Sequence, residues 1–407
     1  MRLGNRQSIR NQILHLVRLN VTTVFMIERP LWLQRIFSSW NLAPIVWLSG
    51  VRRVGKSTLA RAIPDADYIN CDLPSAQQQL ADPEQFYRSL SRPRLILDEV
   101  HQLPDPSRLL KIGADAFPHL RILATGSSTL AATGKFRDSL TGRKRNLHLI
   151  PVRHDELPAF GVTDLQHRLH RGGLPPALLS PHHDPGFYAE WLDSYYARDI
   201  QELFRVEKRG AFLKLVESVL RLSGGQIEAT TLANLTGLSR PTVLNYLDVL
   251  EATHVTRTLR PWSGGSPREL VKQPRIYGFD TGFVAFARGW SDLRPDDLGN
   301  LWEHLVLERL GSDPAAPDLH YWRDKDDHEI DFILPRGRGV VDAIECKWNS
   351  RHFDPDNLRR FRTLHPKGAN FVVSTDITQP LHRTLADLAV TFTGLDTLAS
   401  QIWSKGA

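Results

Sequence analysis

The sequence predicts an α/β protein in three parts: a parallel sheet with a helical lid, then a winged-helix domain, and then a second α/β domain. Strand and helix patterns alternate from Pro30 to about Pro151, which is typical of a parallel sheet covered by helices. A helix-turn-helix pattern follows at residues 227–262, and a hairpin pattern with one apolar face lies at residues 329–348. Together these observations predict three successive folding units.

Length and composition indicate a globular protein with more than one core. The chain has 407 residues, enough for two or three domains. Its 51 Lys and Arg residues exceed its 45 Asp and Glu residues, and the net charge of +6 is compatible with a nucleic-acid partner without requiring one. Cys71 and Cys346 are far apart, so we expect neither a disulfide framework nor a cysteine metal cluster, and a cytoplasmic location. No apolar run reaches ~18 residues, so we expect no membrane contact.

Residues 1–25 form a basic extension with four arginines and no acid. Its apolar run at residues 13–17 is too short for the core of a signal peptide. Two interpretations remain: a basic arm or organellar presequence, or a mis-assigned start with translation beginning at Met26. We prefer the second, because the residues after Met26 have the pattern of a domain start.

The most informative stretch is residues 45–58, where an apolar run leads into a glycine-bounded loop and a helix start. The loop fits the pattern G-x-x-x-x-G-K-[ST], in which the glycines let backbone N–H groups face the β- and γ-phosphates of ATP. Lys56 would reach the transferable phosphate, and the Ser57 hydroxyl would bind Mg²⁺. The residues expected around ATP are Gly50, Val51, Arg52, Arg53, Val54, Gly55, Lys56, Ser57 and Thr58.

Two later strands carry the polar groups that such a loop needs. The strand at residues 94–98 ends in Asp98, expected to hold Mg²⁺ through water, and Glu99, expected to polarise the attacking water. The strand from Arg121 ends in Thr125 and Ser127, whose hydroxyls could sense the γ-phosphate. Each piece alone is also compatible with an ordinary buried strand, but the three pieces in this order favour an ATPase.

The fifth strand is expected at residues 146–152, and a basic turn precedes it. Many ring-forming ATPases place there the arginine that reaches a neighbouring subunit's γ-phosphate. Arg143 is the first candidate and Arg145 the second, which predicts a homo-oligomer. The alternative is a solvated basic turn.

These motifs resemble the AAA+ superfamily, and more narrowly the prokaryotic AAA+ ATPases that carry a nuclease-like C-terminal domain. The resemblance rests on residues 50–58, 95–99, 125–128 and 140–143 and covers the chain from about Met26 to its end. It implies that ATP and Mg²⁺ are cofactors. The Gly172–Pro175 and Tyr195–Ile200 segments also resemble that family, in its helical lid, but their roles stay open.

The helix-turn-helix pattern has a first helix at residues 231–235, a turn at 236–238 and a second helix capped by Ser239. A wing strand is expected at residues 255–260. The exposed side of the second helix offers little positive charge: Arg240, Thr242, Asn245 and Asp248. Contact with DNA and service as a spacer or protein-docking module therefore both remain open.

The C-terminal hairpin brings acids together. If its turn is centred on Arg338, Asp331 lies opposite Glu345 and shares a face with Lys347. The other face is then apolar or nearly so: Ile330, Phe332, Leu334, Ile344, Cys346 and Trp348. Opposed residues have Cβ atoms ~5 Å apart, so the two carboxylates repel unless a cation, most simply Mg²⁺, lies between them.

With Glu303 on a preceding helix, these residues resemble the PD-(D/E)xK nuclease superfamily, the fold of many restriction endonucleases. The resemblance implies that Asp331, Glu345 and the Cys346 carbonyl hold the metal, that Lys347 orients or activates water, and that Glu303 aids metal binding. The reaction would be hydrolysis of a phosphodiester. A salt-bridged surface hairpin, or a nuclease fold kept only for binding, are the alternatives.

The expected division is a basic extension (1–25), an AAA+ core (26–158), a helical lid (159–206), a winged helix (207–262), a linker with a short strand (263–295) and a nuclease-like domain (296–407). The leading hypothesis is that ATP binding and hydrolysis reposition the last domain on DNA for cleavage. The alternatives are a nucleotide-gated switch or scaffold that binds DNA or protein without cleavage, and a motor that moves nucleic acid.

Overall fold

The computed structural model describes residues 27–126, 140–204, 206, 208–263, 273–312, 318–337, 339–385 and 387–403. The predictions on residues 1–25, on Ser127 and on the turn residue Arg338 fall outside these ranges. No helix within these ranges combines the length and the apolar content that crossing a bilayer requires.

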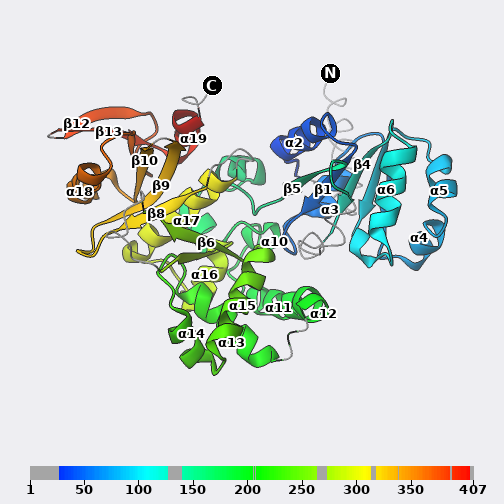
Figure 1. Cartoon of the computed structure of the whole chain (residues 1–407), viewed down its shortest axis with the longest axis horizontal. Coiled ribbons are helices and arrows are strands. Elements are labelled where there is room, and N and C mark those ends of the chain that lie inside the picture. The colour runs from blue at the N-terminus through cyan, green and yellow to red at the C-terminus, as the bar shows by residue number, and fades with distance from the viewer. Residues whose placement is uncertain are drawn as a thin grey trace, which may run out of the picture.

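The first part is a five-stranded parallel sheet, as the sequence predicts (Figure 1, right). In spatial order its strands are β2 (Ala66–Asn70), β3 (Arg94–Asp98), β4 (Arg121–Thr125), β1 (Ile45–Ser49) and β5 (Lys144–His148). Every residue of β1 is buried, because helices cover both faces of the sheet and both edges of this strand are paired. The carboxyl ends of β1 and β3 therefore lie at the same edge of the sheet.

One helix precedes these strands and further helices connect them. They are α2 (Pro30–Trp40), α3 (Lys56–Arg61), α4 (Pro74–Gln79), α5 (Pro83–Ser89), the 3₁₀ turn η1 (Val100–Gln102) and α6 (Pro106–Ala116). Helices α5 and α6 begin in the same way: an aspartate, Asp82 or Asp105, accepts backbone N–H bonds, and a proline fills the first turn.

A run of helices follows where the sequence predicts a lid. It contains η2 (His154–Phe160), α9 (Leu165–Arg171), α10 (Pro175–Leu178), α11 (Pro185–Tyr195), the π-helical turn η3 (Tyr196–Ile200) and α12 (Gln201–Phe204).

Two helices lie where the sequence predicts the helix-turn-helix. Helix α13 (Arg209–Arg221) precedes α14 (Ala229–Thr236) and α15 (Arg240–Ala252). Gly237 ends α14 at φ 70°, and Ser239 accepts a bond from the backbone N–H of Thr242 at 3.3 Å to cap α15.

The predicted wing strand exists as β6 (Thr256–Pro261), but it is not a free wing. It pairs antiparallel with β7 (Arg275–Gly278), the short strand that the sequence predicts, and parallel with β8 (His320–Arg323) of the C-terminal part. Helix α16 (Thr281–Arg288), which follows β7, packs against α9 and α13. The part of 263–295 that the structure describes is thus packed structure and not a spacer.

The C-terminal part is built on the same continuous sheet (Figure 1, left). Its further strands are β9 (Glu329–Gly337), β10 (Val340–Lys347), β11 (Asn370–Ser374), β12 (Leu381–Leu385) and β13 (Leu388–Thr393), in the spatial order β12-β13-β11-β10-β9-β8-β6-β7. Helices α17 (Pro295–Gly311) and α19 (Leu395–Trp403) pack on one face of this sheet, and α18 (Asp356–Leu364) packs on the other. The short 3₁₀ turn η4 (Ser350–His352) precedes α18.

Candidate functional site

The loop between β1 and α3 has the shape that its motif predicts. Gly50 and Gly55 have φ values of 156° and 100°, and a Cβ on Gly50 would lie 2.6 Å from the Leu149 carbonyl oxygen. Glycine is needed at Gly55 for its backbone conformation and at Gly50 for space. The loop curls over the Lys56 ammonium, which donates to the carbonyls of Gly50 at 2.8 Å and Val51 at 3.2 Å. Burial lowers the pKa of Lys56, and the nearby charge of Glu99 partly offsets that effect.

Asp98 is held by two hydroxyl groups at the end of β3. The Tyr68 hydroxyl donates to its Oδ2, and the Thr125 hydroxyl donates to its Oδ1. Thr125 Oγ1 also accepts the backbone N–H of Glu99 at 3.1 Å. This hydroxyl is fully buried and bonded to both residues, and its role as a γ-phosphate sensor stays a prediction.

A pocket of about 570 Å³ lies over the loop. Its walls are the loop residues 50–58, Glu99 and His101 from the sheet edge, and side chains of α10, α11 and η3. The size suits a nucleotide, since ligand pockets usually span roughly 300–1,000 Å³. The predicted loop residues and Glu99 are thus brought together, whereas Asp98 lies just behind the wall at 3% exposure.

The lid helices contact the two loop arginines directly. Arg52 Nε lies 2.5 Å from Asp199 Oδ2, and Arg53 Nη2 lies 2.5 Å from Glu190 Oε1. The Trp191 indole donates to the carbonyl of Arg52 at 3.0 Å. The Tyr195–Ile200 segment, whose role the sequence leaves open, therefore lies on the loop.

The Gly172–Pro175 segment lies at a junction of buried charges. Gly173 donates its N–H to Asp280 Oδ2 at 2.6 Å, and a Cβ on Gly172 would lie 1.8 Å from Asp280 Oδ1. The fully buried Arg168 donates to the Val152 carbonyl at 3.0 Å and to Glu308 Oε2 at 2.8 Å. Burial raises the pKa of Glu308 to about 7. This junction joins the end of the first part to α16 and α17.

Arg143 lies away from its own chain's loop. Its carbonyl accepts the N–H of Ile45 at 3.2 Å, which places it at the amino end of β1, whereas the loop follows the carboxyl end. Its exposed guanidinium pairs with Asp115 at 2.6 Å. Five strand residues separate it from the loop by roughly 16 Å, so within one chain it cannot reach the pocket.

The register predicted for the C-terminal hairpin is confirmed. Val341 pairs with Pro335, and Ile344 pairs with Phe332, so the ladder is centred on position 338. Asp331 and Glu345 lie one residue beyond the last of these pairs. One apolar position is wrong: Ile330 packs in the core of the α18 face, because the pairing of β8 with β9 shifts register between His320 and Trp322.

One oxygen of each of these two acids has a partner within the protein. Asp331 Oδ2 accepts the N–H of Cys346 at 2.7 Å, and Glu345 Oε2 accepts the Lys347 ammonium at 3.0 Å. Glu345 Oε1 is buried and has no hydrogen-bond partner within the described residues. Burial and the charge of Asp331 raise the pKa of Glu345 to about 8. Burial lowers the pKa of Lys347, but the charges of Asp331 and Glu345 outweigh it and raise this pKa above its usual value.

Glu303 joins this centre through partners that the sequence does not reveal. Its Oε1 accepts the Tyr277 hydroxyl and lies 3.2 Å from Arg275 Nη1. Arg275 also pairs with Glu329. Burial and the charge of Asp331 raise the pKa of Glu303 to about 8. Arg275 and Tyr277 are two residues apart on β7, so their side chains lie on the same face of the strand. This spacing is the one feature of the sequence that could have drawn attention to them.

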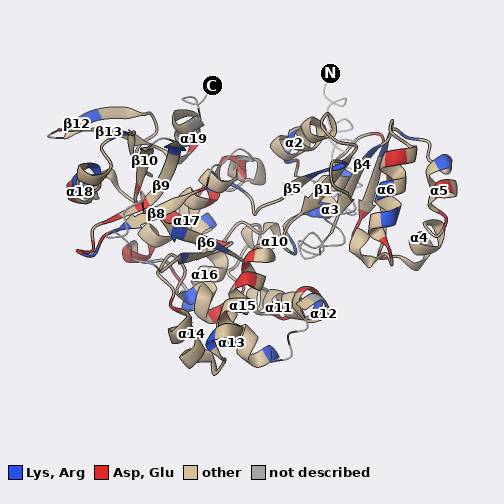
Figure 2. Cartoon of the chain, in the orientation of Figure 1, with Lys and Arg blue, Asp and Glu red and all other residues tan. Residues whose placement is uncertain are grey.

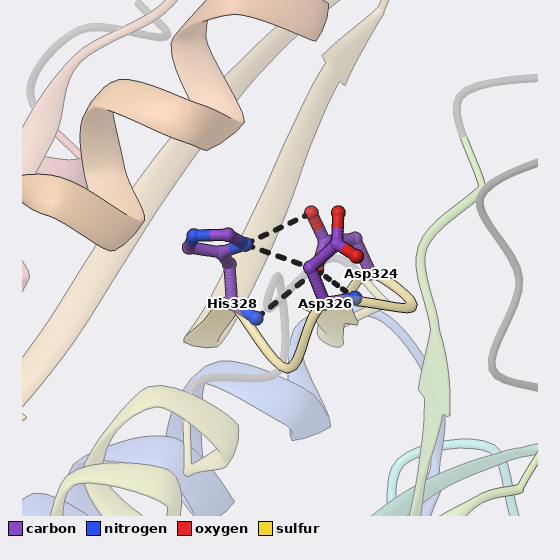
Figure 3. A group of neighbouring side chains, drawn as sticks. All are labelled: Asp324, Asp326 and His328. Atoms are coloured by element: carbon purple, nitrogen blue, oxygen red, sulfur yellow. Dashed lines mark hydrogen bonds and ion pairs between the residues drawn. The ribbon is translucent and has the colours of Figure 1, made fainter.

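The buried, unpartnered oxygen of Glu345 and the charge of Asp331 fit a Mg²⁺ ion, which prefers oxygen ligands and keeps several waters. Across the described residues, the one group of three ligands with atoms within 4.8 Å of one another lies elsewhere, at Asp324, Asp326 and His328 (Figure 3). There Asp324 Oδ1 accepts the N–H groups of Asp326 at 2.9 Å and His328 at 3.0 Å. Arg360 Nε donates to Asp324 Oδ2 at 3.0 Å. This group closes the turn between β8 and β9.

The second helix of the helix-turn-helix carries little positive charge. Helix α15 contains one basic residue, Arg240, and two acids, Asp248 and Glu251 (Figure 2). Leu235 and Leu244 are 47% and 40% exposed on the same pair of helices. This surface offers few phosphate contacts.

Comparison with known proteins divides the chain in three. An AAA domain matches residues 43–157, and two domains of unknown function, DUF8612 and DUF4143, match residues 162–294 and 298–389. The chain is 30% identical over 324 residues to the uncharacterised proteins Mb2031c of Mycobacterium bovis and Rv2008c of Mycobacterium tuberculosis, covering 76% of this chain and 71% of theirs.

Solved structures match more weakly. AMPPCP-bound DnaA from Aquifex aeolicus is 14% identical with a TM-score of 0.27, covering 54% of this chain and 85% of that chain. McrB from Thermococcus gammatolerans, an AAA+ hexamer with bound McrC, is 13% identical with a TM-score of 0.18, covering 45% of this chain and 47% of that chain. With such scores these likenesses bear on neither mechanism nor partners.

Proposed function

This chain belongs to the family of the mycobacterial proteins Rv2008c and Mb2031c and carries an AAA domain, and on that premise we propose that it hydrolyses ATP. We further propose that it couples its nucleotide state to a DNA-acting, Mg²⁺-dependent nuclease-like centre. The observation that carries the ATPase is the pocket in which the loop, Glu99 and the lid helices meet. Those that favour the second centre are the hairpin register and the unpartnered oxygen of Glu345.

In the nucleotide pocket the loop residues 50–58 surround the phosphates and Lys56 neutralises their charge. Ser57 and Asp98 would hold Mg²⁺, which when bound offsets charge on the β- and γ-phosphates. Glu99 orients the attacking water and takes its proton, while Thr125 and Tyr68 fix Asp98.

In the C-terminal centre Asp331, Glu345 and the Cys346 carbonyl would hold Mg²⁺, which when bound polarises the scissile phosphate. Lys347 lies beside Glu345 and orients the attacking water. Arg275 and Tyr277 hold Glu303 near this centre.

The two centres are connected through a chain of contacts that is exposed at Arg53–Glu190 and buried at Arg168. Asp199 and Glu190 hold the loop arginines, and the Arg168 junction leads from the first part to α17, the helix that carries Glu303. A change in the lid on nucleotide binding would therefore reach the C-terminal sheet. This coupling, and a partner subunit's Arg143 at the pocket, belong to the proposal.

The ATPase is tested by measuring phosphate release from ATP with Mg²⁺. We expect Lys56→Ala to abolish release, because the phosphates lose their cation, while Lys111→Ala on the exposed side of α6 leaves it unchanged. Equal rates for the two variants would contradict the proposal.

The nuclease is tested on supercoiled and linear DNA with Mg²⁺ and ATP. We expect cleavage that Lys347→Ala removes and that Lys367→Ala, an exposed lysine on the same part, retains. ATP turnover without cleavage would instead support the second candidate, a nucleotide-gated switch or scaffold that binds DNA or protein. Two observations favour that candidate: the low positive charge of α15, and the pairing of Glu303 with protein groups.

A further inference from the structure

His101 contacts the residue expected to activate water, although the sequence motifs do not include it. It lies in η1, directly after β3, and its Nδ1 is 3.2 Å from Glu99 Oε2. Both side chains line the nucleotide pocket.

The backbone of Glu99 is already set in an unusual conformation. Its φ of 55° is rarely adopted by a residue other than glycine, and its N–H donates to the buried Thr125 hydroxyl at 3.1 Å. These two features turn the side chain towards the pocket, at 36% exposure. Within the described residues, His101 Nδ1 is the side-chain atom found at ion-pair distance from this carboxylate.

The contact with Gln102 indicates which nitrogen of His101 carries the proton. Its Nε2 lies 3.1 Å from the Gln102 Nε2, an amide nitrogen that can only donate, so His101 Nε2 accepts. Burial lowers the pKa of His101, which keeps the ring neutral. The remaining N–H is then on Nδ1, which lies 3.2 Å from Glu99 Oε2. Within the described residues these two atoms are close but not aligned for a hydrogen bond, and such catalytic contacts often tighten only when substrate binds.

The surrounding chain leaves room for this ring. A Cβ on Gly126 would lie 2.6 Å from the Trp47 ring and 3.3 Å from His101 Nδ1. A side chain at position 126 would therefore crowd both rings.

We propose that His101 is the positioning residue that holds Glu99 ready to activate water in ATP hydrolysis. The inference rests on the proposed ATPase. With substrate bound, the imidazole N–H donates to Glu99 Oε2, and Oε1 accepts a proton from water. The water oxygen then bonds to the γ-phosphorus, the bond from that phosphorus to the bridging oxygen breaks, and ADP leaves with the electron pair.

The test compares His101→Ala, His101→Asn and His101→Gln with the wild type, using ATP turnover and the binding of a fluorescent ATP analogue, mant-ATP. We expect His101→Ala to lower kcat about 10-fold to 100-fold, because a misplaced base loses most of its advantage, with KM and mant-ATP affinity unchanged. Asn places an N–H donor where Nδ1 stands, so His101→Asn should recover most of kcat. Gln places its donor where Nε2 stands and should not. The exposed His119→Ala is the control.

Wild-type kcat in His101→Ala would overturn the inference, as would a parallel loss of mant-ATP affinity or equal recovery by Asn and Gln. A wild-type protein that binds mant-ATP without releasing phosphate would refute the proposed ATPase itself, and the inference with it. The variants therefore test the role of His101, and phosphate release by the wild type tests the ATPase.

Discussion

The Thr125 hydroxyl has two hydrogen-bond partners, Asp98 and the Glu99 N–H. Removing this hydroxyl by mutation distinguishes a structural role from a role in sensing the γ-phosphate. Thr125→Val keeps the shape, removes the bond to Asp98 and leaves the Glu99 N–H unpaired. We expect a loss of about 1–3 kcal/mol in the free energy of unfolding, measured by denaturant titration, together with slower ATP turnover. Thr125→Ser, which keeps the hydroxyl, should retain most of the turnover. Slower turnover at unchanged stability would support the sensor hypothesis.

Glu308 makes stability depend on pH. The single cation of Arg168 lies near two buried acids, Asp280 and Glu308, and burial raises the Glu308 pKa from its usual 4.5 to about 7. The folded chain therefore holds a proton that the unfolded chain releases above its own lower pKa, so this group makes the fold less stable as pH rises from about 4.5 to about 7.

The matched variant is Glu308→Gln, which cannot titrate. Relative to it, the wild type should lose up to about 3 kcal/mol of unfolding free energy between those two pH values and no more above them. Parallel pH curves for the two proteins would show that Glu308 does not hold this proton.

Some site residues could be predicted from sequence because their chemistry is encoded locally. The loop glycines, Lys56 and the acids after β3 lie in short motifs whose spacing fixes their geometry. The roles of Arg275 and Tyr277 could not be predicted, because both residues act by binding Glu303, which lies 28 and 26 residues away on another element. His101 was missed because its role depends on the backbone conformation of Glu99.

The end of α9 shows how one glycine can join two elements. Gly172 has φ 75° and ψ −171°, a region that only glycine adopts readily, and its missing side chain makes room for Asp280. We expect Gly172→Ala to lower the unfolding free energy by at least about 3 kcal/mol, because it displaces a buried carboxylate.

Gly161→Ala is the matched control. Gly161 has a similar φ of 70° but lies in the left-handed helical region with no atom within 4 Å of its added Cβ. It should cost only about 1–2 kcal/mol. Equal losses in the two variants, measured by thermal and denaturant unfolding, would mean that the contact with Asp280 is unimportant.

Elements with strong local signals could be predicted: the five parallel strands, the capped pair α14 and α15, and the register of β9 with β10. Helix α16 and the role of β6 could not. The apolar side of α16 packs against helices distant in sequence, and β6 pairs with a strand about 60 residues further along the chain. No periodicity within a short window reports such partners.

For the whole molecule, our proposal that Arg143 completes a neighbouring subunit's pocket predicts that ATP turnover needs two subunits. Arg143→Ala and Lys56→Ala should each be inactive alone, since one lacks the arginine that a neighbour's pocket requires and the other cannot bind the phosphates. Mixed one to one, they should recover activity at about one interface in four, where an intact pocket meets an intact arginine.

Arg145→Ala tests the second candidate in the same assay and should retain turnover. Absence of recovery in the mixture, or full activity of Arg143→Ala alone, would leave the Arg143 pair with Asp115 as an ordinary surface ion pair.

Strand β6 belongs to the helix-turn-helix by sequence and to the C-terminal sheet by pairing. A fragment that begins at residue 298 would strip β6 and β7 from β8 and leave an unpaired sheet edge, which is a template for aggregation. Recombinant expression of the last part alone should therefore yield insoluble material unless the fragment starts upstream of α13. For the same reason, gene fusion cannot transplant this C-terminal part to a new host protein without carrying the helix-turn-helix with it.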